Sequence, residues 1–190
     1  MHDTNIIYEA NYKSALSFLK LGMKEQAFDC LNLAFSQVSP ENKTIDNVLY
    51  FYILSDLSVL SIEKPDKGRA KALIEEGLSV KKDHADLLFL KALLLMDENR
   101  YDEMLESITH YFLSSTAGDI SLYNYRFTHE GALREIYDNL LPVAYKNAFQ
   151  HLQIRDVVFR LCEVTNNIYL LRAHEIMVKI DSVRTEKGQS

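Results

Sequence analysis

Histidine and cysteine are the residue types in this chain best able to bind a metal or act as a nucleophile. The six histidines include no pair four residues apart around a glutamate, the spacing that zinc peptidases use. They are His2, His84, His110, His129, His151 and His174. Cys30 and Cys162 stand 132 residues apart inside helical patterns and form no local metal or redox motif. We therefore expect no metal site, and we interpret both cysteines as small buried hydrophobic residues.

Motifs for phosphate binding and acid–base chemistry are also absent. Gly68 and Gly77 fall at the start of, or within, a predicted helix rather than after a strand, so the usual nucleotide fingerprints do not occur. Helical spacing brings no acid and base together in a way that would make a catalytic pair. We expect no catalytic residue and no cofactor, and we expect that the chain is not an enzyme.

Two clusters have both a structural and a functional interpretation. The first is acidic: Asp97, Glu98, Asp102, Glu103 and Glu106. We interpret it as a solvated face that complements a helix dipole, with a docking surface as the alternative. The second consists of Tyr123, Tyr125 and Phe127, which we interpret as an extended stretch packed over neighbouring helices, with a ligand contact as the alternative.

The composition favours one compact helical domain over residues 1–190. The chain is 47% hydrophobic, and its 6 glycines and 3 prolines are too few for a fold rich in tight turns. A net charge of -6 argues against nucleic acid and anionic membranes as partners. The longest apolar run, residues 87–96, falls short of the roughly 20 residues that cross a bilayer, and no secretory signal is recognisable. We expect a cytoplasmic protein with a protein or peptide partner, and a homodimer is left open.

Apolar residues recur at helical spacing along almost the whole chain. Caps, glycines and prolines divide this pattern into nine predicted helices, which the following ranges give: 6–21, 24–38, 45–62, 67–80, 85–97, 101–115, 130–149, 153–165 and 168–184. Pro142 is expected to kink or split the seventh helix. Short connections predict antiparallel helix hairpins, so the fold class is all-α.

Three of these hairpins share one pattern of small and large residues. The second and third hairpins are offset by 34 residues, and the first and second by 43, as if nine extra residues lay near residues 39–47. In the three hairpins in turn, the pattern consists of Ala15, Phe18, Gly22, Ala27, Leu31 and Ala34; Ser58, Ser61, Pro65, Ala70, Ile74 and Gly77; and Ala92, Leu95, Asn99, Met104, Ile108 and Tyr111. Small side chains let two helices approach closely, and large ones fill the spaces between them.

A helical hairpin that repeats every 34 residues resembles the tetratricopeptide repeat (TPR) family, here over about residues 8–117. The repeats would span residues 8–41, 51–84 and 85–118, followed by a helical remainder at 119–184. The resemblance implies a right-handed α-solenoid in which the first helix of each pair lines a concave groove. Another type of helical fold is the alternative.

The resemblance also implies which residues face the groove. The binding residues that we predict from it are Tyr12, Leu16, Leu19, Lys20, Tyr52, Val59, Phe89, Leu93 and Met96, and Ser55, Ile62 and Asp86 occupy further groove positions. Most of them are apolar, and the Asn and Lys residues of a carboxylate clamp are missing. The last predicted helix carries an apolar stripe of Leu170, Ala173, Met177 and Ile180, with Asp181 among the residues on its other faces. We interpret this helix as a cap, with filling of the groove or binding of a partner as the alternative.

These observations favour a non-enzymatic scaffold or adaptor that binds an apolar peptide or an amphipathic helix in its concave groove. The alternative is an accessory TPR module of an enzyme system such as a glycosyltransferase, because residues 124–148 faintly resemble the helical repeats beside such catalytic domains.

Overall fold

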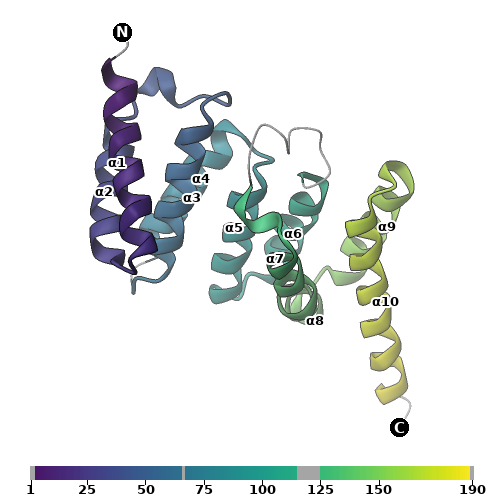
Figure 1. Cartoon of the computed structure of the whole chain (residues 1–190). Coiled ribbons are helices and arrows are strands. Elements are labelled where there is room, and N and C mark those ends of the chain that lie inside the picture. The colour runs from purple at the N-terminus through teal and green to yellow at the C-terminus, as the bar shows by residue number, and fades with distance from the viewer. Residues whose placement is uncertain (1–2, 66, 115–124, 189–190) are drawn as a thin grey trace. The chain divides into compact units, whose positions relative to one another are not determined.

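The computed structural model describes residues 3–65, 67–114 and 125–188, with side chains between 7 and 184. Within these ranges every regular element is helical, and no strand occurs. Apart from two short 3₁₀ helices, the described residues form nine helices when the contiguous segments over 130–147 are counted as one (Figure 1). The helices fall into two compact units, Met1–Lys82 and Asp83–Ser190. The predicted fold class is therefore confirmed as all-α.

The first unit consists of two helix pairs. Its helices are α1 (Asp3–Lys20), α2 (Lys24–Gln37), α3 (Val48–Ile62) and α4 (Gly68–Val80), with a 3₁₀ turn η1 (Pro40–Asn42) before α3. α1 packs on α2, α3 packs on α4, and α2 packs on α3. The connection from α2 to α3 covers residues 38–47, whereas the connection that follows α4 covers only residues 81–84. The extra residues inferred from the repeat offset lie in this longer connection.

The second unit begins with another pair, α5 (Ala85–Asp97) and α6 (Tyr101–Ser114). The next elements are η3 (Arg126–Thr128), α7 (Glu130–Glu135), η4 (Ile136–Leu140), α8 (Leu141–Asn147), α9 (His151–Thr165) and α10 (Ile168–Gly188). α6 packs on α8, and α10 packs on α9, α8 and α6. Arg126–Thr128 thus forms a short 3₁₀ helix and not the extended stretch that the sequence suggested; Tyr123 lies outside the described residues.

Two of the hairpin turns have the same backbone geometry. Gly22 between α1 and α2, and Asn99 between α5 and α6, both adopt left-handed conformations, with φ values of 73° and 57°. In each turn the N–H of the next residue donates to the carbonyl five residues earlier, at 2.9 Å. This Schellman arrangement satisfies carbonyls at the end of the first helix and turns the chain back.

The repeated small and large positions are buried in all three of these pairs. The buried sets are Ala15, Ser58 and Ala92; Ala27, Ala70 and Met104; Leu31, Ile74 and Ile108; and Ala34, Gly77 and Tyr111. Phe18 is half-exposed, although its counterparts Ser61 and Leu95 are buried. The repeat in the sequence therefore corresponds to a repeat in packing within each pair.

The helix that contains Pro142 is continuous and is not split. Residues 136–140 form one π-helical segment, in which the N–H of Leu141 donates to the carbonyl of Ile136. Proline lacks the N–H that an α-helix would direct to the carbonyl four residues earlier, and its ring crowds that carbonyl. The wider π turn immediately before Pro142 accommodates this local disruption.

The apolar stripe of α10 faces the rest of its unit. Leu170, Ala173 and Met177 are buried, whereas Ile180 is half-exposed. Asp181, assigned from the sequence to another face, instead points into the unit and contacts Tyr145 of α8. That assignment was wrong, because a buried tyrosine hydroxyl on the neighbouring helix provides a partner for the carboxylate.

Candidate functional site

The nine predicted groove residues differ in how exposed their side chains are. Tyr12 and Phe89 are buried, at 6% and 7% exposure, and Lys20 is exposed. The remaining six are half-buried: Leu16, Leu19, Tyr52, Val59, Leu93 and Met96. Only the last group presents apolar side chains that a partner could contact without prior rearrangement.

Exposure follows the repeat register on α1, α3 and α5. The equivalent positions Tyr12, Ser55 and Phe89 are all buried. One turn later, Leu16, Val59 and Leu93 are all half-exposed, as are Leu19, Ile62 and Met96 in the following turn. Each of these three helices thus carries the same pair of half-exposed aliphatic or thioether side chains, and this recurrence was predictable from the repeat offset.

α1 and α3 run side by side in the same direction. The amide nitrogen of Asn47 lies 3.4 Å from the Tyr8 hydroxyl, and the Tyr12 hydroxyl donates to Asp56 at 3.1 Å. Residues that come later on α1 therefore lie next to residues that come later on α3. We give the name α1–α3 face to the half-exposed apolar residues that follow these contacts in register on the two helices, which are Leu16, Leu19, Val59 and Ile62.

Tyr12 links the two helices beneath this face. Its hydroxyl contacts Asp56, which is 6% exposed, and a hydrogen bond to a buried carboxylate costs more to lose than a neutral one at the surface. The structure therefore places Tyr12 in the core of the first unit, where it sets the spacing of α1 and α3.

Two reciprocal ion pairs lie at the end of the α1–α3 face. Lys24 of α2 contacts Glu63 at 2.7 Å, and Lys64 contacts Glu25 of α2 at 2.9 Å. The Lys64 ammonium also lies 4.6 Å from the centre of the Phe28 ring. These contacts join the start of α2 to the end of α3, and they pair Lys64 with a carboxylate and an aromatic ring.

On α5, the chain itself covers the first half of the corresponding surface. The Phe127 ring stacks on Phe89, with ring centres 4.9 Å apart. Asp86 accepts hydrogen bonds from the main-chain N–H groups of Arg126 and Phe127, at 3.0 and 2.9 Å. The Tyr111 hydroxyl donates to the Phe127 carbonyl at 2.5 Å. Leu93 and Met96 lie in the second half of α5, beyond this cover.

Asp86 was assigned to the groove wall by its register, but its side chain is fully buried. Two main-chain N–H groups arrive from 40 and 41 residues away and satisfy the carboxylate. Its role is to hold η3 on α5, and no local sequence signal identifies that role.

Most of the histidines contact nearby rings or backbone. His84 lies edge-on to Tyr125, and His174 contacts Phe159. His129 caps α7 by accepting the N–H of Ala132 at 3.2 Å. His2 lies outside the described residues. Among the side chains that the structure describes, no group of three histidines, cysteines or carboxylates could hold a metal ion.

The two cysteines differ in burial. Cys162 is buried, as predicted, and burial raises the pKa of its thiol, which opposes formation of the nucleophilic thiolate. Cys30 is half-exposed, so the prediction of a buried residue was wrong there. Its position on α2 lies beside Leu31 and not on the face that packs against α1 and α3.

The acidic cluster near α6 also has internal partners. Glu98 and Glu103 both bind the Arg100 guanidinium, at 2.7 and 2.5 Å. Asp102 accepts the main-chain N–H groups of residues 149 and 150, just before α9. The cluster therefore positions the start of α9, and less of it remains available for docking than its charge suggested.

No family model, no curated protein and no solved structure matches this chain. Within the described part of the chain, none of the helices combines the length and apolar character needed to cross a membrane. The case for the α1–α3 face therefore rests on its residues and geometry alone.

Proposed function

We propose that this chain is a non-enzymatic scaffold or adaptor whose α1–α3 face binds an apolar peptide or an amphipathic helix of another protein. The observation that carries this proposal is the recurrence of two half-exposed apolar positions in register on α1, α3 and α5. Isolated exposed aliphatic side chains are common on protein surfaces, but a repeated row is typical of an interaction surface.

The proposal includes the TPR-like right-handed solenoid that the repeat pattern implies. Three observations support it: shared turn geometry at Gly22 and Asn99, burial of the repeated packing positions, and packing of α2 on α3 and of α6 on α8. In this arrangement α10 would cap the last pair.

Binding would come from burial of aliphatic side chains. The four residues of the α1–α3 face carry no charge, and the lysines at its end are paired with glutamates, so specificity for a terminal carboxylate is not expected. Each fully buried Leu or Val contributes about 1.5–3 kcal/mol, so a few such contacts on a preformed surface can support a micromolar complex. The face is held by the Tyr12–Asp56 contact and by the two ion pairs near Glu63.

The test is quantitative co-purification from native cytosol with the tagged full-length chain and with the double variant Leu16→Glu/Val59→Glu. Both positions are half-exposed, so the variant should keep its helical circular dichroism spectrum while losing the captured partner. Leu33→Glu is the matched control, because Leu33 is 53% exposed on α2 and lies outside the face. Equal recovery of the same proteins by the double variant and by the control would contradict the proposal.

Tyr12 and Phe89 are unsuitable for this test, although the sequence suggested them. Both are buried, and Phe→Ala in a core costs about 3–5 kcal/mol. Loss of binding by those variants could reflect unfolding rather than loss of a contact.

A further inference from the structure

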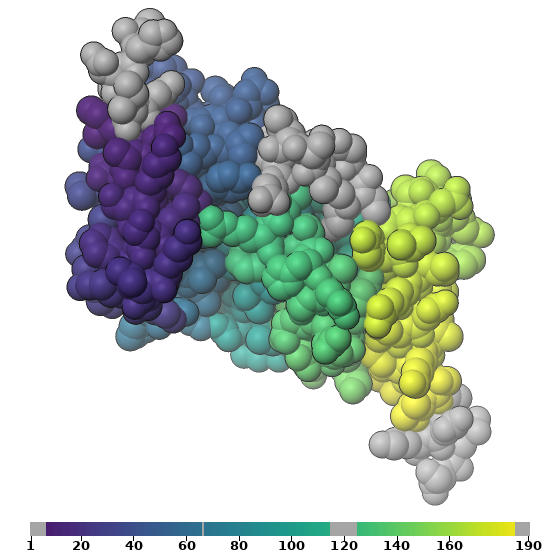
Figure 2. All heavy atoms as spheres, viewed as in Figure 1, coloured from purple at the N-terminus to yellow at the C-terminus, as the bar shows by residue number. Residues whose placement is uncertain are grey.

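A second apolar surface lies in the second unit, between the helix over residues 130–147 and α10. One hollow of about 260 Å³ separates residues 130–138 from residues 168–172. A second, of about 360 Å³, separates Pro142 and Lys146 from residues 176–184. The early residues of one helix face the early residues of the other, and the late residues face the late ones. The two helices therefore run in the same direction. Figure 2 shows them side by side, in green and yellow.

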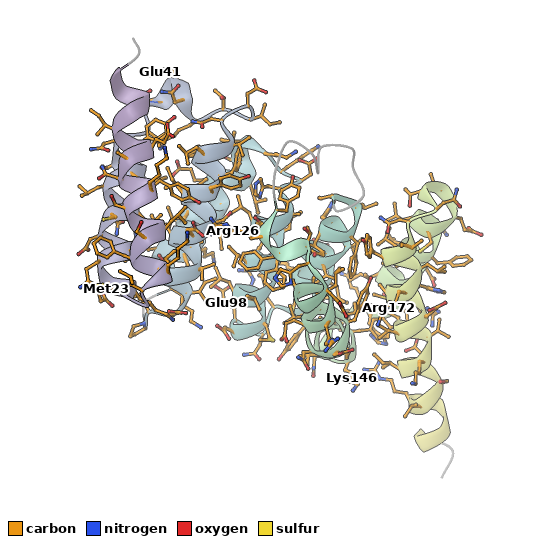
Figure 3. The ribbon with its side chains drawn as sticks, viewed as in Figure 1. Met23, Glu41, Glu98, Arg126, Lys146 and Arg172 are labelled. Atoms are coloured by element: carbon orange, nitrogen blue, oxygen red, sulfur yellow. The ribbon has the colours of Figure 1, made fainter. Side chains whose placement is uncertain are left out.

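The two hollows differ in chemistry. In the first, the guanidinium of Arg172, which Figure 3 labels, lies over the Tyr137 ring, 4.5 Å from its centre. The Tyr137 hydroxyl donates to the Tyr169 carbonyl at 3.0 Å. Glu130, Arg134 and Asp138 add charges of both signs around it. This hollow is therefore already bridged by its own side chains.

The second hollow has an apolar floor. We call it the α8–α10 groove, and its apolar residues are Pro142 of α8 with Ile176, Ile180 and Val183 of α10. The three α10 residues recur at positions i, i+4 and i+7, the spacing of one helical stripe. Ile176 and Ile180 are half-exposed and Val183 is 45% exposed, so the stripe is not covered by the rest of the chain.

The rim of the α8–α10 groove is basic. Its charged residues are Lys146, Lys179 and Arg184, and no carboxylate lines it. Arg184 donates to the Lys146 carbonyl at 2.5 Å, which satisfies a terminal carbonyl of α8 and keeps a guanidinium at the rim. Among the described residues of the second unit, the ion pairs are formed by arginines and not by these two lysines, although Glu175 lies one turn before Lys179. This is a local excess of positive charge on a chain whose net charge is -6.

Asp181 interacts with one residue of this rim, Arg184, and with partners inside the unit. Its carboxylate accepts the Tyr145 hydroxyl at 2.7 Å and the Arg155 guanidinium at 2.5 Å, so it is directed toward α8 and α9. The Arg184 guanidinium is 3.9 Å from Asp181, at the limit of an ion pair. Asp181 therefore offsets part of the charge of Arg184, whereas Lys146 and Lys179 contribute positive charge to the rim.

We propose that the α8–α10 groove binds an amphipathic helix of a partner protein whose polar edge is acidic. Its apolar stripe would fit against Ile176, Ile180 and Val183, as ridges of one helix fit the grooves between two others. Carboxylates along its edge would face Lys146 and Lys179, which favours acidic over basic partners. The proposal concerns residues outside the α1–α3 face, so either site can fail without the other.

The probes are two synthetic peptides with the same apolar stripe, one with glutamates and one with lysines along its polar edges. Binding to the full-length chain is followed by fluorescence anisotropy. We expect the acidic peptide to bind at least about tenfold more tightly than the basic one, and added salt to reduce the difference. Lys146→Glu/Lys179→Glu should reverse this preference, and Val183→Asp should weaken both peptides.

The control variants make the same kinds of substitution at similarly exposed positions outside the groove. Arg160→Glu changes an exposed cation on α9, and Val157→Asp changes a residue that is 52% exposed on the same helix. Neither should alter peptide binding, and neither should Leu16→Glu/Val59→Glu in the first unit.

Three results would overturn the proposal. The first is equal affinity for the two peptides, or equal loss in the controls and the groove variants. The second is a dimer by light scattering that Val183→Asp dissociates, which would identify a second copy as the occupant. The third is tighter binding to vesicles of anionic lipid than to the acidic peptide, with the same dependence on Lys146 and Lys179.

Discussion

Phe127 stacks on Phe89 with their ring planes inclined by only 23°, and so covers a position that the repeat register assigns to a binding groove. The cover arrives from η3, outside the predicted repeats, and Asp86 holds it through two main-chain hydrogen bonds. In the second unit, the chain itself therefore covers this position. Under the proposed function, α5 would contribute only the turns around Leu93 and Met96 to binding.

Replacing Phe89 should destabilise the fold more than replacing Phe127. Phe89→Ala removes a buried ring and should lower the free energy of unfolding by about 3–5 kcal/mol. Phe127 is half-exposed, so Phe127→Ala should cost less. A double-mutant cycle measured by urea denaturation should give a coupling of about 0.5–1.5 kcal/mol for the stacked pair. Strict additivity would show that the stacking contributes nothing beyond separate burial.

Asp86→Asn should lower stability although it changes little in volume. The carboxylate accepts two N–H groups, whereas an asparagine has one carbonyl oxygen and would turn its amide donors toward the other N–H. The expected loss is about 1.5–3 kcal/mol in urea denaturation. Asp138→Asn, at an exposed position on η4, is the control and should be nearly neutral. Similar effects of the two substitutions would argue against a buried anchoring role for Asp86.

The helices were predictable because their signals are local. Apolar periodicity and end signals such as Gly22 and Asn99 gave bounds close to those observed, and the repeat offset identified which positions would be buried in each pair. Pro142 correctly indicated an irregularity in its helix, but it did not indicate that the irregularity would be a π turn. A π turn and a kink both accommodate a missing N–H, and the choice depends on how the helix packs.

The covering of Phe89 was not predictable from local pattern. The interactions of Asp86 with residues 126 and 127 cross about 40 positions and bring together segments that no periodicity relates. The α8–α10 groove was missed for a similar reason. The stripe of Ile176, Ile180 and Val183 is visible in the sequence, but its basic rim depends on α8 and α10 becoming parallel neighbours.

Gly22→Ala should destabilise the first hairpin through backbone conformation alone. An added Cβ would meet nothing within 4 Å, but φ at this position is 73°. A left-handed conformation costs a residue with a side chain roughly 1–2 kcal/mol. Gly68→Ala is the matched control, since Gly68 is the exposed first residue of α4 and has no positive φ. That variant should gain about 0.4–1 kcal/mol by restricting the unfolded chain. Thermal unfolding of both proteins checks the opposite signs, and equal shifts would contradict the assigned backbone conformation.

Alkaline pH should destabilise the protein through its buried tyrosines. Burial, the largest cause, raises the pKa values of Tyr50, Tyr137 and Tyr145 above the ordinary value; hydrogen bonds to Glu76 and Asp181 also raise those of Tyr50 and Tyr145. An unfolded tyrosine loses its proton near pH 10, whereas these folded ones keep theirs. The folded state then binds more protons, so stability is complete below about pH 10 and falls as pH rises above it.

Urea denaturation across this alkaline range, with phenolate absorbance recorded in parallel, measures the effect. Tyr50→Phe and Tyr145→Phe should each make the decline of stability with pH less steep, because a group that cannot ionise contributes no proton difference. Each variant also removes a hydrogen bond, at 2.9 Å to Glu76 or 2.7 Å to Asp181, so its stability near neutral pH should fall as well. A decline as steep as that of the unmodified chain in both variants would show that other groups control the alkaline transition.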